Sequence, residues 1–236
     1  METSSVPIIV SVGFMIAVII VVIVLSQIRA QKRTEALTAF AQEIGFAFKG
    51  DSWNHQPKAH QLGTALFGRG SGRRFSNVMT GTDSGLETSL FDYSYTISTG
   101  KSSSTITQTV AAYSSDLSLP LFEMRPEGFF DRVGDALVHS DIDFESNPDF
   151  SQKYLLRGPS EEGIRRLFSP ALLTFLENLP LDKKWHIEGC DTNLIIYRSL
   201  TVSVEGLHSF LEQTSTIART FFNSSAGLSK AGTTKQ

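Results

Sequence analysis

The sequence predicts an α+β protein built from one transmembrane helix and one water-facing body. Two observations indicate this class: a long uncharged stretch near the N-terminus, and beyond it alternating apolar patterns followed by helix-periodic ones. We expect an N-terminal transmembrane helix, then an antiparallel β-meander, then a mixed strand-helix-helix-hairpin-helix unit. The corresponding boundaries are 1–28 for the N-terminal segment and anchor, 29–45 for a juxtamembrane helix, 46–125 for the β-rich part, 126–222 for an α+β part packed on it, and 223–236 for a disordered tail.

The anchor is the uncharged stretch at residues 6–25, with the sequence VPIIVSVGFMIAVIIVVIVL. At about 1.5 Å per residue, a helix of this length spans the hydrocarbon layer of a bilayer, which is about 30 Å thick. A cleaved signal peptide has a basic start and an apolar core of roughly 7–15 residues, whereas this chain begins METSS and has a longer core. We therefore expect an uncleaved anchor that binds the lipid bilayer through residues 6–25.

The charges that flank the anchor predict its orientation. Arg29, Lys32 and Arg33 follow the apolar stretch, whereas only Glu2 and the terminal amine precede it. Because cytoplasmic flanks carry the excess of Lys and Arg, we expect the N-terminus outside and the C-terminal body in the cytoplasm. The single cysteine, Cys190, cannot form a disulfide within the chain, which weakly favours a reducing compartment.

Composition argues against one class of partner. The net charge is −3 and the pI is about 6.0, whereas nucleic-acid-binding domains carry a basic excess on their surface. We therefore expect no nucleic acid among the partners. The 17 phenylalanines predict a well-packed aromatic core in the body.

A second helix is predicted at residues 34–44, directly after the anchor. Its apolar side chains recur at positions i, i+3, i+4 and i+7: Leu37, Phe40, Ala41 and Ile44. Gly45 stands where a C-terminal cap belongs. This helix either packs on the domain or lies on the bilayer, and its acidic residues Glu35 and Glu43 favour packing on the domain, because anionic headgroups repel them.

The β-rich part shows alternation broken by turn residues. A hairpin turn is predicted at Asp83-Ser84-Gly85, between two strands of opposite direction. The predicted strands span 46–49, 75–82, 86–96, 105–113 and 121–125.

The α+β part combines short elements with clear boundary signals. Ser160 is a predicted N-cap, and Ser169-Pro170 restarts a helix with proline at its first position. A hairpin is predicted across Gly189-Cys190-Asp191. The full set is a short helix at 126–137, an extended segment at 139–145, a strand at 154–157, two helices from 160 and 169, hairpin strands at 185–188 and 194–197, and a last helix at 204–222.

Several motifs give the chain a resemblance to a family of uncharacterised bacterial membrane-anchored proteins, known as a domain of unknown function. They are Asn77, Phe91-Asp92-Tyr93, Tyr95, Arg125-Pro126-Glu127, Phe150, Tyr154-Leu155-Leu156-Arg157-Gly158, Leu167-Phe168-Ser169-Pro170 and the segment 185–197. The resemblance implies a single-pass, membrane-tethered α+β module in the bacterial cytoplasmic membrane. The family supplies no activity to transfer, and the motifs are typical of packing and turns.

One acidic segment is a candidate metal site. Its potential ligands alternate along the predicted extended segment and so share one face: His139, Asp141, Asp143 and Glu145. The spacing also imitates the start of an EF-hand loop, but Ser146 replaces the required glycine and Gln152 replaces the bidentate glutamate. The alternative, which we favour, is a half-buried segment with its polar face in water.

One basic segment is a candidate anion site. In the stretch FGRGSGRR, three arginines, Arg69, Arg73 and Arg74, stand among glycines whose backbone amides are free to bind phosphate. The Gly-Lys-Ser/Thr ending of a P-loop is missing, so a lipid headgroup fits better than a nucleotide. A solvated loop without a ligand is the simpler reading.

Other reactive residues give weaker signals. Cys190 and His186 flank a predicted turn with no orienting carboxylate, which makes a poor nucleophile pair. His55 and His60 have no nearby Cys or third His for a zinc site. The G-x-S-x-G, H-E-x-x-H and dinucleotide fingerprints are absent from the sequence, and no cofactor is predicted.

These observations favour a non-enzymatic interaction or scaffold module that faces the cytoplasm and acts on another protein at the membrane. Tethering would raise the effective concentration of such a partner at the bilayer. The second hypothesis is an anionic-lipid or anion-sensing domain that uses the three arginines. The third is a metal-dependent enzyme built around the acidic segment.

Overall fold

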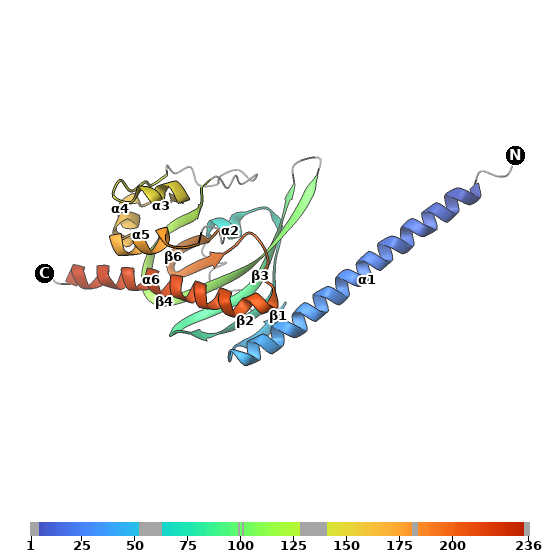
Figure 1. Ribbon diagram of the computed structural model, residues 1–236, viewed down its shortest axis with the longest axis horizontal. Coiled ribbons are helices and arrows are strands. Elements are labelled where there is room, and N and C mark those ends of the chain that lie inside the picture. The colour runs from blue at the N-terminus through green and yellow to red at the C-terminus, as the bar shows by residue number, and fades with distance from the viewer. Residues whose placement is uncertain are drawn as a thin grey trace.

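The computed structural model describes residues 5–51, 63–98, 100, 102–127, 141–180 and 184–233, and it confirms the predicted α+β class (Figure 1). A long N-terminal helix leads into an antiparallel sheet with helices after it. The elements are α1 Ser5–Glu43, β1 Ala47–Gly50, α2 Ala65–Gly68, β2 Ser71–Asp83, β3 Leu86–Ser98, β4 Ser103–Pro126, α3 Pro148–Lys153, β5 Tyr154–Arg157, α4 Glu161–Leu167, α5 Pro170–Glu177, β6 His186–Tyr197, the 3-10 helix η4 Val204–Gly206 and α6 Leu207–Thr233.

The sheet is organised around β4, a strand of 24 residues. Its first half pairs with β3, its end pairs with β5, and β6 runs along its other edge. The remaining order is β1-β2-β3-β4, and all pairings are antiparallel. The strands predicted at 105–113 and 121–125 are thus one strand, and both predicted halves of the body share one sheet.

The hairpin predicted across residues 189–191 is wrong, because β6 continues through them. Gly189 lies opposite Phe122 of β4, and Asp191 lies opposite Leu119. A Cβ on Gly189 would stand 2.2 Å from the Phe122 ring, so this glycine allows a close approach between strands. Asp191 has φ 52°, and the register shifts on either side of its pair with Leu119, which produces a bulge where the sequence suggested a turn.

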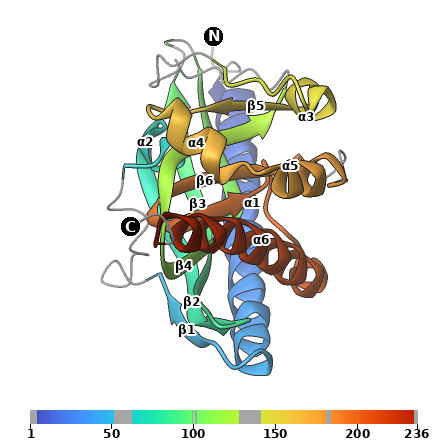
Figure 2. The ribbon, with the colours of Figure 1, turned by 90° about the vertical axis from the view of Figure 1, so that its left-hand side faces the viewer.

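The two faces of the sheet carry separate apolar clusters. In Figure 2, α4, α5 and α6 lie in front of the strands, and their apolar side chains pack with the last turns of α1 on this face. Phe122, Phe168 and Phe221 form its aromatic centre, with ring centroids 5.3–5.6 Å apart. The opposite face packs against α2, through Leu66 and Phe67.

The local boundary signals of the later helices are confirmed. The Ser160 side chain accepts a hydrogen bond from the Gly163 amide, and the Ser169 side chain accepts one from the Leu172 amide. Pro170 occupies the first turn of α5.

The C-terminal helix is longer than the sequence suggested. It was expected to end at 222 and be followed by a disordered tail, but α6 runs to Thr233. Ser224 donates a hydrogen bond to the Leu167 carbonyl at 2.6 Å, and Ser225 donates one to the Ser118 carbonyl at 2.7 Å. Polar composition indicated disorder, whereas these hydroxyls bind neighbouring backbone.

Two predicted segments overlap residues 128–140, which are not described. The short helix expected at 126–137 lies among them from residue 128 onward, and Pro126 itself ends β4. The extended segment expected at 139–145 is described from residue 141 onward. Residues 141–144 have no regular secondary structure, although the Ile142 amide donates to the Leu156 carbonyl at 2.9 Å beside β5.

Candidate functional site

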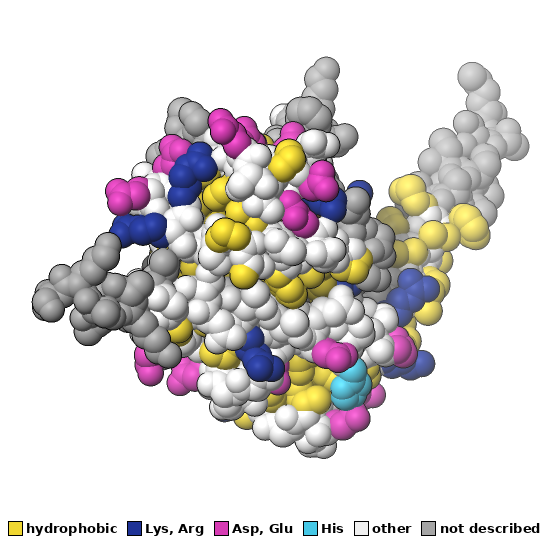
Figure 3. Space-filling view, turned by 60° about the vertical axis from the view of Figure 1, so that its left-hand side comes forward, with side chains coloured by type: hydrophobic (Ala, Val, Ile, Leu, Met, Phe, Trp, Pro, Cys, Tyr) yellow, Lys and Arg dark blue, Asp and Glu magenta, His cyan; other side chains and the backbone are white. Residues whose placement is uncertain are grey.

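Helix α1 passes without interruption from the apolar stretch into the domain. Its portion at Phe14–Glu43 is long and apolar enough to cross a membrane, with a mean hydropathy of 2.2 in its most apolar window. Leu37, Phe40 and Ala41 are buried against the domain, as expected for a packed helix. Figure 3 shows the apolar side chains of α1 extending beyond the body, with basic side chains where the helix meets it.

A Schellman motif ends this helix. Gly45 has φ 74° and donates to the Gln42 carbonyl at 3.2 Å, while Phe46 donates to the Ala41 carbonyl at 2.7 Å. The predicted glycine cap is therefore confirmed. The chain leaves α1 in a fixed direction and enters β1 at once.

A partly buried ion pair links α1 to the sheet of the domain. Arg33 donates from Nε to Asp92 Oδ2 and from Nη2 to Asp92 Oδ1, both at 2.9 Å. Its Nη1 also donates to the Val202 carbonyl at 2.9 Å. The Asp92 side chain is 5% exposed and that of Arg33 is 25% exposed. A bidentate pair of this kind fixes orientation as well as distance.

Asp92 receives two further donors from neighbouring strands. Asn77 Nδ2 on β2 lies 3.0 Å from one carboxylate oxygen, and Thr109 Oγ1 on β4 lies 2.9 Å from the other. The Thr109 hydroxyl also accepts from the Val202 amide at 2.9 Å. These five residues, Arg33, Asn77, Asp92, Thr109 and Val202, form what we call the Asp92 cluster, which joins α1 to three strands and one loop.

No motif in the sequence brings the members of this cluster together, although several of them stand in predicted features. Arg33 is one of the charges that flank the anchor, and Asp92 belongs to one of the motifs that carry the resemblance. A signal was present, since Asp92 stands between Phe91 and Tyr93 in a strand, and a buried Asp almost always has a partner.

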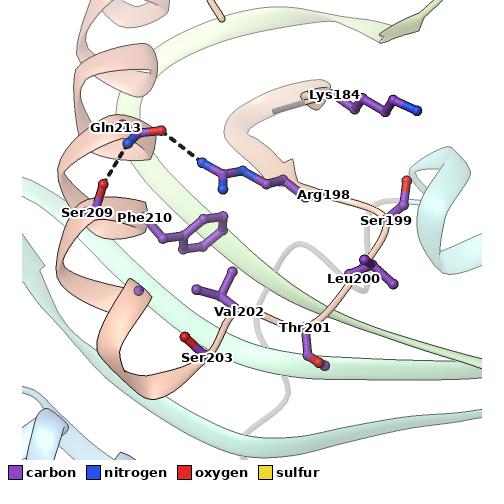
Figure 4. A pocket seen from close by; sticks show the side chains of 11 residues that line it. Lys184, Arg198, Ser199, Leu200, Thr201, Val202, Ser203, Ser209, Phe210 and Gln213 are labelled. Atoms are coloured by element: carbon purple, nitrogen blue, oxygen red, sulfur yellow. Dashed lines mark hydrogen bonds between the residues drawn. The ribbon is translucent and has the colours of Figure 1, made fainter. Parts of the chain in front are cut away.

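A pocket of about 480 Å³ opens beside this junction, between α6 and the connection from β6 to η4 (Figure 4). We call it the α6 pocket. Its described lining contains two basic side chains, several hydroxyls and no acidic side chain. The lining residues are Lys184, Arg198, Ser199, Leu200, Thr201, Val202, Ser203, Gly206, Ser209, Phe210 and Gln213.

Arg198 is held inside the pocket by an aromatic surface and an amide. Its guanidinium lies 4.0 Å from the Trp185 ring centroid and 5.5 Å from that of Phe210. Its Nη2 donates to Gln213 Oε1 at 2.8 Å, and Gln213 donates to Ser209 at 2.7 Å (Figure 4). The positive charge is therefore kept in one position against a stacked pair of rings.

The rim of the α6 pocket carries an exposed leucine. Leu200 is 75% exposed, and within the part of the chain whose side chains the structure describes, it is the one exposed large apolar residue outside α1. The carbonyl of Val202, two residues later, accepts the bond from Arg33. The leucine therefore lies in the loop that α1 holds.

A second buried polar group lies on the opposite face of the sheet. Glu188 is 1% exposed and accepts from the Leu66 amide at 3.0 and 3.1 Å and from the Tyr197 hydroxyl at 2.8 Å. The Tyr197 ring stacks on His186 with centroids 4.8 Å apart. Burial, followed by the positive charge of Arg69, lowers the pKa of His186 to about 3.

The three predicted anion-binding arginines each have internal partners. Arg69 pairs with Glu123 at 2.6 Å, with both side chains 10% exposed. Arg73 donates to the carbonyls of Gly68, Arg69 and Gly70, and Arg74 pairs with Asp51. Arg73 and Arg74 are exposed and adjacent on β2, so an anion site there stays a prediction.

The predicted metal ligands are placed on a polar edge. Ile142 and Phe144 are buried while Asp141, Asp143 and Glu145 are exposed, which is the alternation the sequence indicated. His139 lies outside the described residues, within which no group of three His, Cys, Asp or Glu side chains could hold a metal ion. Asp141 Oδ1 accepts from the Leu156 amide at 2.9 Å, and burial raises the pKa of this carboxyl. The metal site stays a prediction.

The arrangement gives little support to a nucleophile. Burial, followed by the negative charge of Asp191, raises the pKa of Cys190 and so disfavours its thiolate. The Ser199 hydroxyl lies 3.5 Å from His186 Nε2, but a histidine with a pKa of about 3 is a weak general base. His55 and His60 lie outside the described residues.

No model of a known protein family matches this chain, and no curated protein matches it. Among solved structures, the fold is similar to that in the crystal structure of the mycobacterial trehalose monomycolate transport factor A, TtfA. The TM-score is 0.57 at 13% sequence identity, over 81% of this chain and 93% of that chain. At this identity the likeness concerns the fold, while function must be argued from the sites.

Proposed function

We propose that this chain is a single-pass membrane protein that holds its α+β domain rigidly at the bilayer surface as a non-enzymatic binding platform for another protein. The observation that carries the proposal is the unbroken α1 together with the Arg33–Asp92 pair. A flexible tether would only raise local concentration, whereas a helix clamped to the sheet also sets the height and orientation of the domain.

The geometry supports this in quantitative terms. Arg33 follows Leu25, the last residue of the apolar stretch 6–25, by eight positions, or about 12 Å along a helix. The headgroup region adds about 5–7 Å outside the hydrocarbon layer. A domain clamped at Arg33 therefore stands within reach of the membrane surface.

The chain shares its fold with a protein named as a transport factor, which fits the same role. A helper that positions other components needs an anchor and a rigid body, and it needs no catalytic group of its own. We accordingly place the partner in the same membrane or at its surface, on the cytoplasmic side of a bacterial inner membrane.

The test replaces the tether while keeping the domain. In a strain that lacks this protein, a variant with residues 6–25 exchanged for an unrelated apolar helix should reverse the defect that the deletion causes, because the anchor acts only as a helix. A copy with seven glycines inserted after Ile28 should fail, since glycine breaks the rigid connection. Full restoration by the glycine copy would contradict the proposal, as would one polar substitution that abolishes a turnover activity of the purified chain.

Orientation has its own measurement. A fluorescent reporter fused after Gln236 should be bright and an alkaline phosphatase fusion inactive, because Arg29 and Lys32 are exposed on α1 next to the apolar stretch. The opposite pattern would place the domain outside and move the search for its partner to the envelope.

A lipid- or anion-sensing role is the second candidate, and the α6 pocket favours it more than the predicted arginines do. Arg69 is committed to Glu123, whereas the pocket is open and lined by Arg198 and Lys184.

A further inference from the structure

We infer that the α6 pocket binds the headgroup of an anionic phospholipid from the bilayer in which α1 is anchored. The inference rests on the second candidate function above and deepens it, because it names the class of ligand and the site that binds it. It rests on three features of the pocket: its charge, its hydrogen-bonding groups and its position.

The charge of the pocket suits a phosphate. Among its described lining residues, Arg198 and Lys184 are positive and none is negative. The guanidinium carbon of Arg198 lies 4.0 Å from the Trp185 ring centroid, a cation–π contact that helps to hold the guanidinium in place. Arginine recognises phosphate through its planar set of donors, and preorganisation against the rings lowers the entropy lost on binding.

The remaining polar groups suit a hydroxylated headgroup. Figure 4 shows side chains of α6 and of the β6–η4 connection around one opening, with Arg198 and Gln213 directed toward each other across it. Four hydroxyl side chains line the pocket: Ser199, Thr201, Ser203 and Ser209. Its volume of about 480 Å³ falls in the range of roughly 300–1,000 Å³ that is usual for small-ligand sites.

The position of the pocket favours a lipid over a free anion. Figure 1 shows the connection from β6 to α6 at the end of the domain opposite the C-terminus, beside α1. Arg33 binds this connection directly, at the Val202 carbonyl. Leu200, 75% exposed on the same loop, would contact acyl chains or glycerol while the headgroup occupies the pocket.

The experiment uses the fluorescence of Trp185, which lies directly under Arg198. The full chain with Trp53→Phe, purified in uncharged maltoside micelles, keeps Trp185 as its one tryptophan. Dioctanoyl phosphatidylglycerol should cause a saturable change, with an apparent affinity at least about tenfold above that of dioctanoyl phosphatidylcholine. Inorganic phosphate is titrated in parallel, and it should bind more weakly still because it offers nothing to Leu200.

Two variants localise the binding. Arg198→Gln should weaken phosphatidylglycerol binding about tenfold, and Leu200→Ser about fivefold. Leu200 is exposed, so its variant tests the proposal even where Arg198→Gln fails to fold. Arg166→Gln, an exposed arginine on α4 away from the pocket, is the matched control and should change nothing.

Each contrary outcome overturns a defined part of the proposal. Equal affinity for phosphatidylcholine would remove the anionic selectivity, and equal affinity for inorganic phosphate would make this a free-anion site. A phosphatidylglycerol signal unchanged in both variants, or no saturable signal, would remove the site altogether. None of these outcomes bears on the tether, which is tested separately by the glycine insertion.

Discussion

The two faces of the sheet each bury a carboxylate, and the two carboxylates hold different kinds of segment. On one face, Asp92 of β3 binds an arginine of α1 and side chains of two neighbouring strands. On the other, Glu188 of β6 binds the Leu66 amide of the short helix α2 and the hydroxyl of Tyr197. The Asp92 cluster thus connects the long apolar helix α1 to the domain, whereas the Glu188 group connects two segments within the domain.

The Asp92 cluster and the Glu188 group differ in what the loss of each carboxylate would do. Loss of Asp92 would remove the ion pair that orients α1 and leave Arg33 without its carboxylate partner, while the apolar packing of α1 would remain. Loss of Glu188 would leave two donors unpaired in a core but would leave the anchor attached. Stability and orientation can therefore be separated by experiment.

The largest effect is expected for Asp92→Ala. Removing one partner of a buried pair leaves the other charge uncompensated, so the free energy of unfolding should fall by about 3 kcal/mol, less than for a fully buried pair because Arg33 is 25% exposed. Spin-label distances between α1 and the domain should also broaden in the full chain. Arg33→Gln should broaden the same distances, since it breaks the same contacts, and unchanged distances in both variants would show that the pair does not orient the domain.

The second effect tests the other face. Glu188→Ala leaves the Leu66 amide and the Tyr197 hydroxyl without their acceptor, which should cost about 2–3 kcal/mol in chemical unfolding. Glu188→Gln keeps an acceptor oxygen and should cost less than half as much. The α1-to-domain distances should stay as in the unchanged chain, and broadening here would mean that the two faces are not independent.

The third prediction concerns pH. The unfolded chain protonates His186 near its ordinary pKa of 6.5, whereas the folded chain keeps it neutral down to about 3. The unfolded state therefore binds more protons in this window, and stability falls as the pH falls below 6.5. Between pH 6.5 and pH 5 this histidine should cost about 2 kcal/mol, at about 1.4 kcal/mol per unit.

One substitution separates this histidine from the other titrating groups. His186→Phe keeps a ring against Tyr197 and should flatten the pH dependence of unfolding over the same window. Equal slopes in the unchanged chain and in His186→Phe would refute the assignment.

Features that depend on neighbouring residues could be predicted from the sequence, whereas pairings between distant residues could not. The Gly45 cap and the Ser160 N-cap each depend on residues within one turn, and the structure agrees with both. The Asp92 pair joins residues 59 positions apart, and the contact of Glu188 with Leu66 spans 122 positions. Nothing in the local pattern encodes such partners.

The errors have the same origin. Gly189-Cys190-Asp191 carries turn residues, yet the glycine accommodates the Phe122 ring of a strand more than sixty residues earlier. The α6 pocket is formed mainly by a loop and the helix that directly follows it, but its polar residues match no motif of known spacing. The acidic and arginine segments were visible because their charges are contiguous, whereas the Asp92 cluster joins charges from segments far apart in the sequence.

The smallest change in the free energy of unfolding is expected for Arg74, because its ion pair with Asp51 is exposed whereas the Arg33–Asp92 pair is largely buried. Arg74 and Asp51 are also an arginine–aspartate pair, but their side chains are 65% and 48% exposed. Water already solvates both charges there, so Arg74→Gln should change the free energy of unfolding by no more than about 0.5 kcal/mol. The same variant also tests the predicted anion site. If Arg69, Arg73 and Arg74 bind an anion together, Arg74→Gln should weaken the binding of the domain to liposomes. A cost near that of Asp92→Ala would mean that burial does not distinguish the two pairs, and the assignment of the Asp92 cluster as the attachment of α1 would lose its basis.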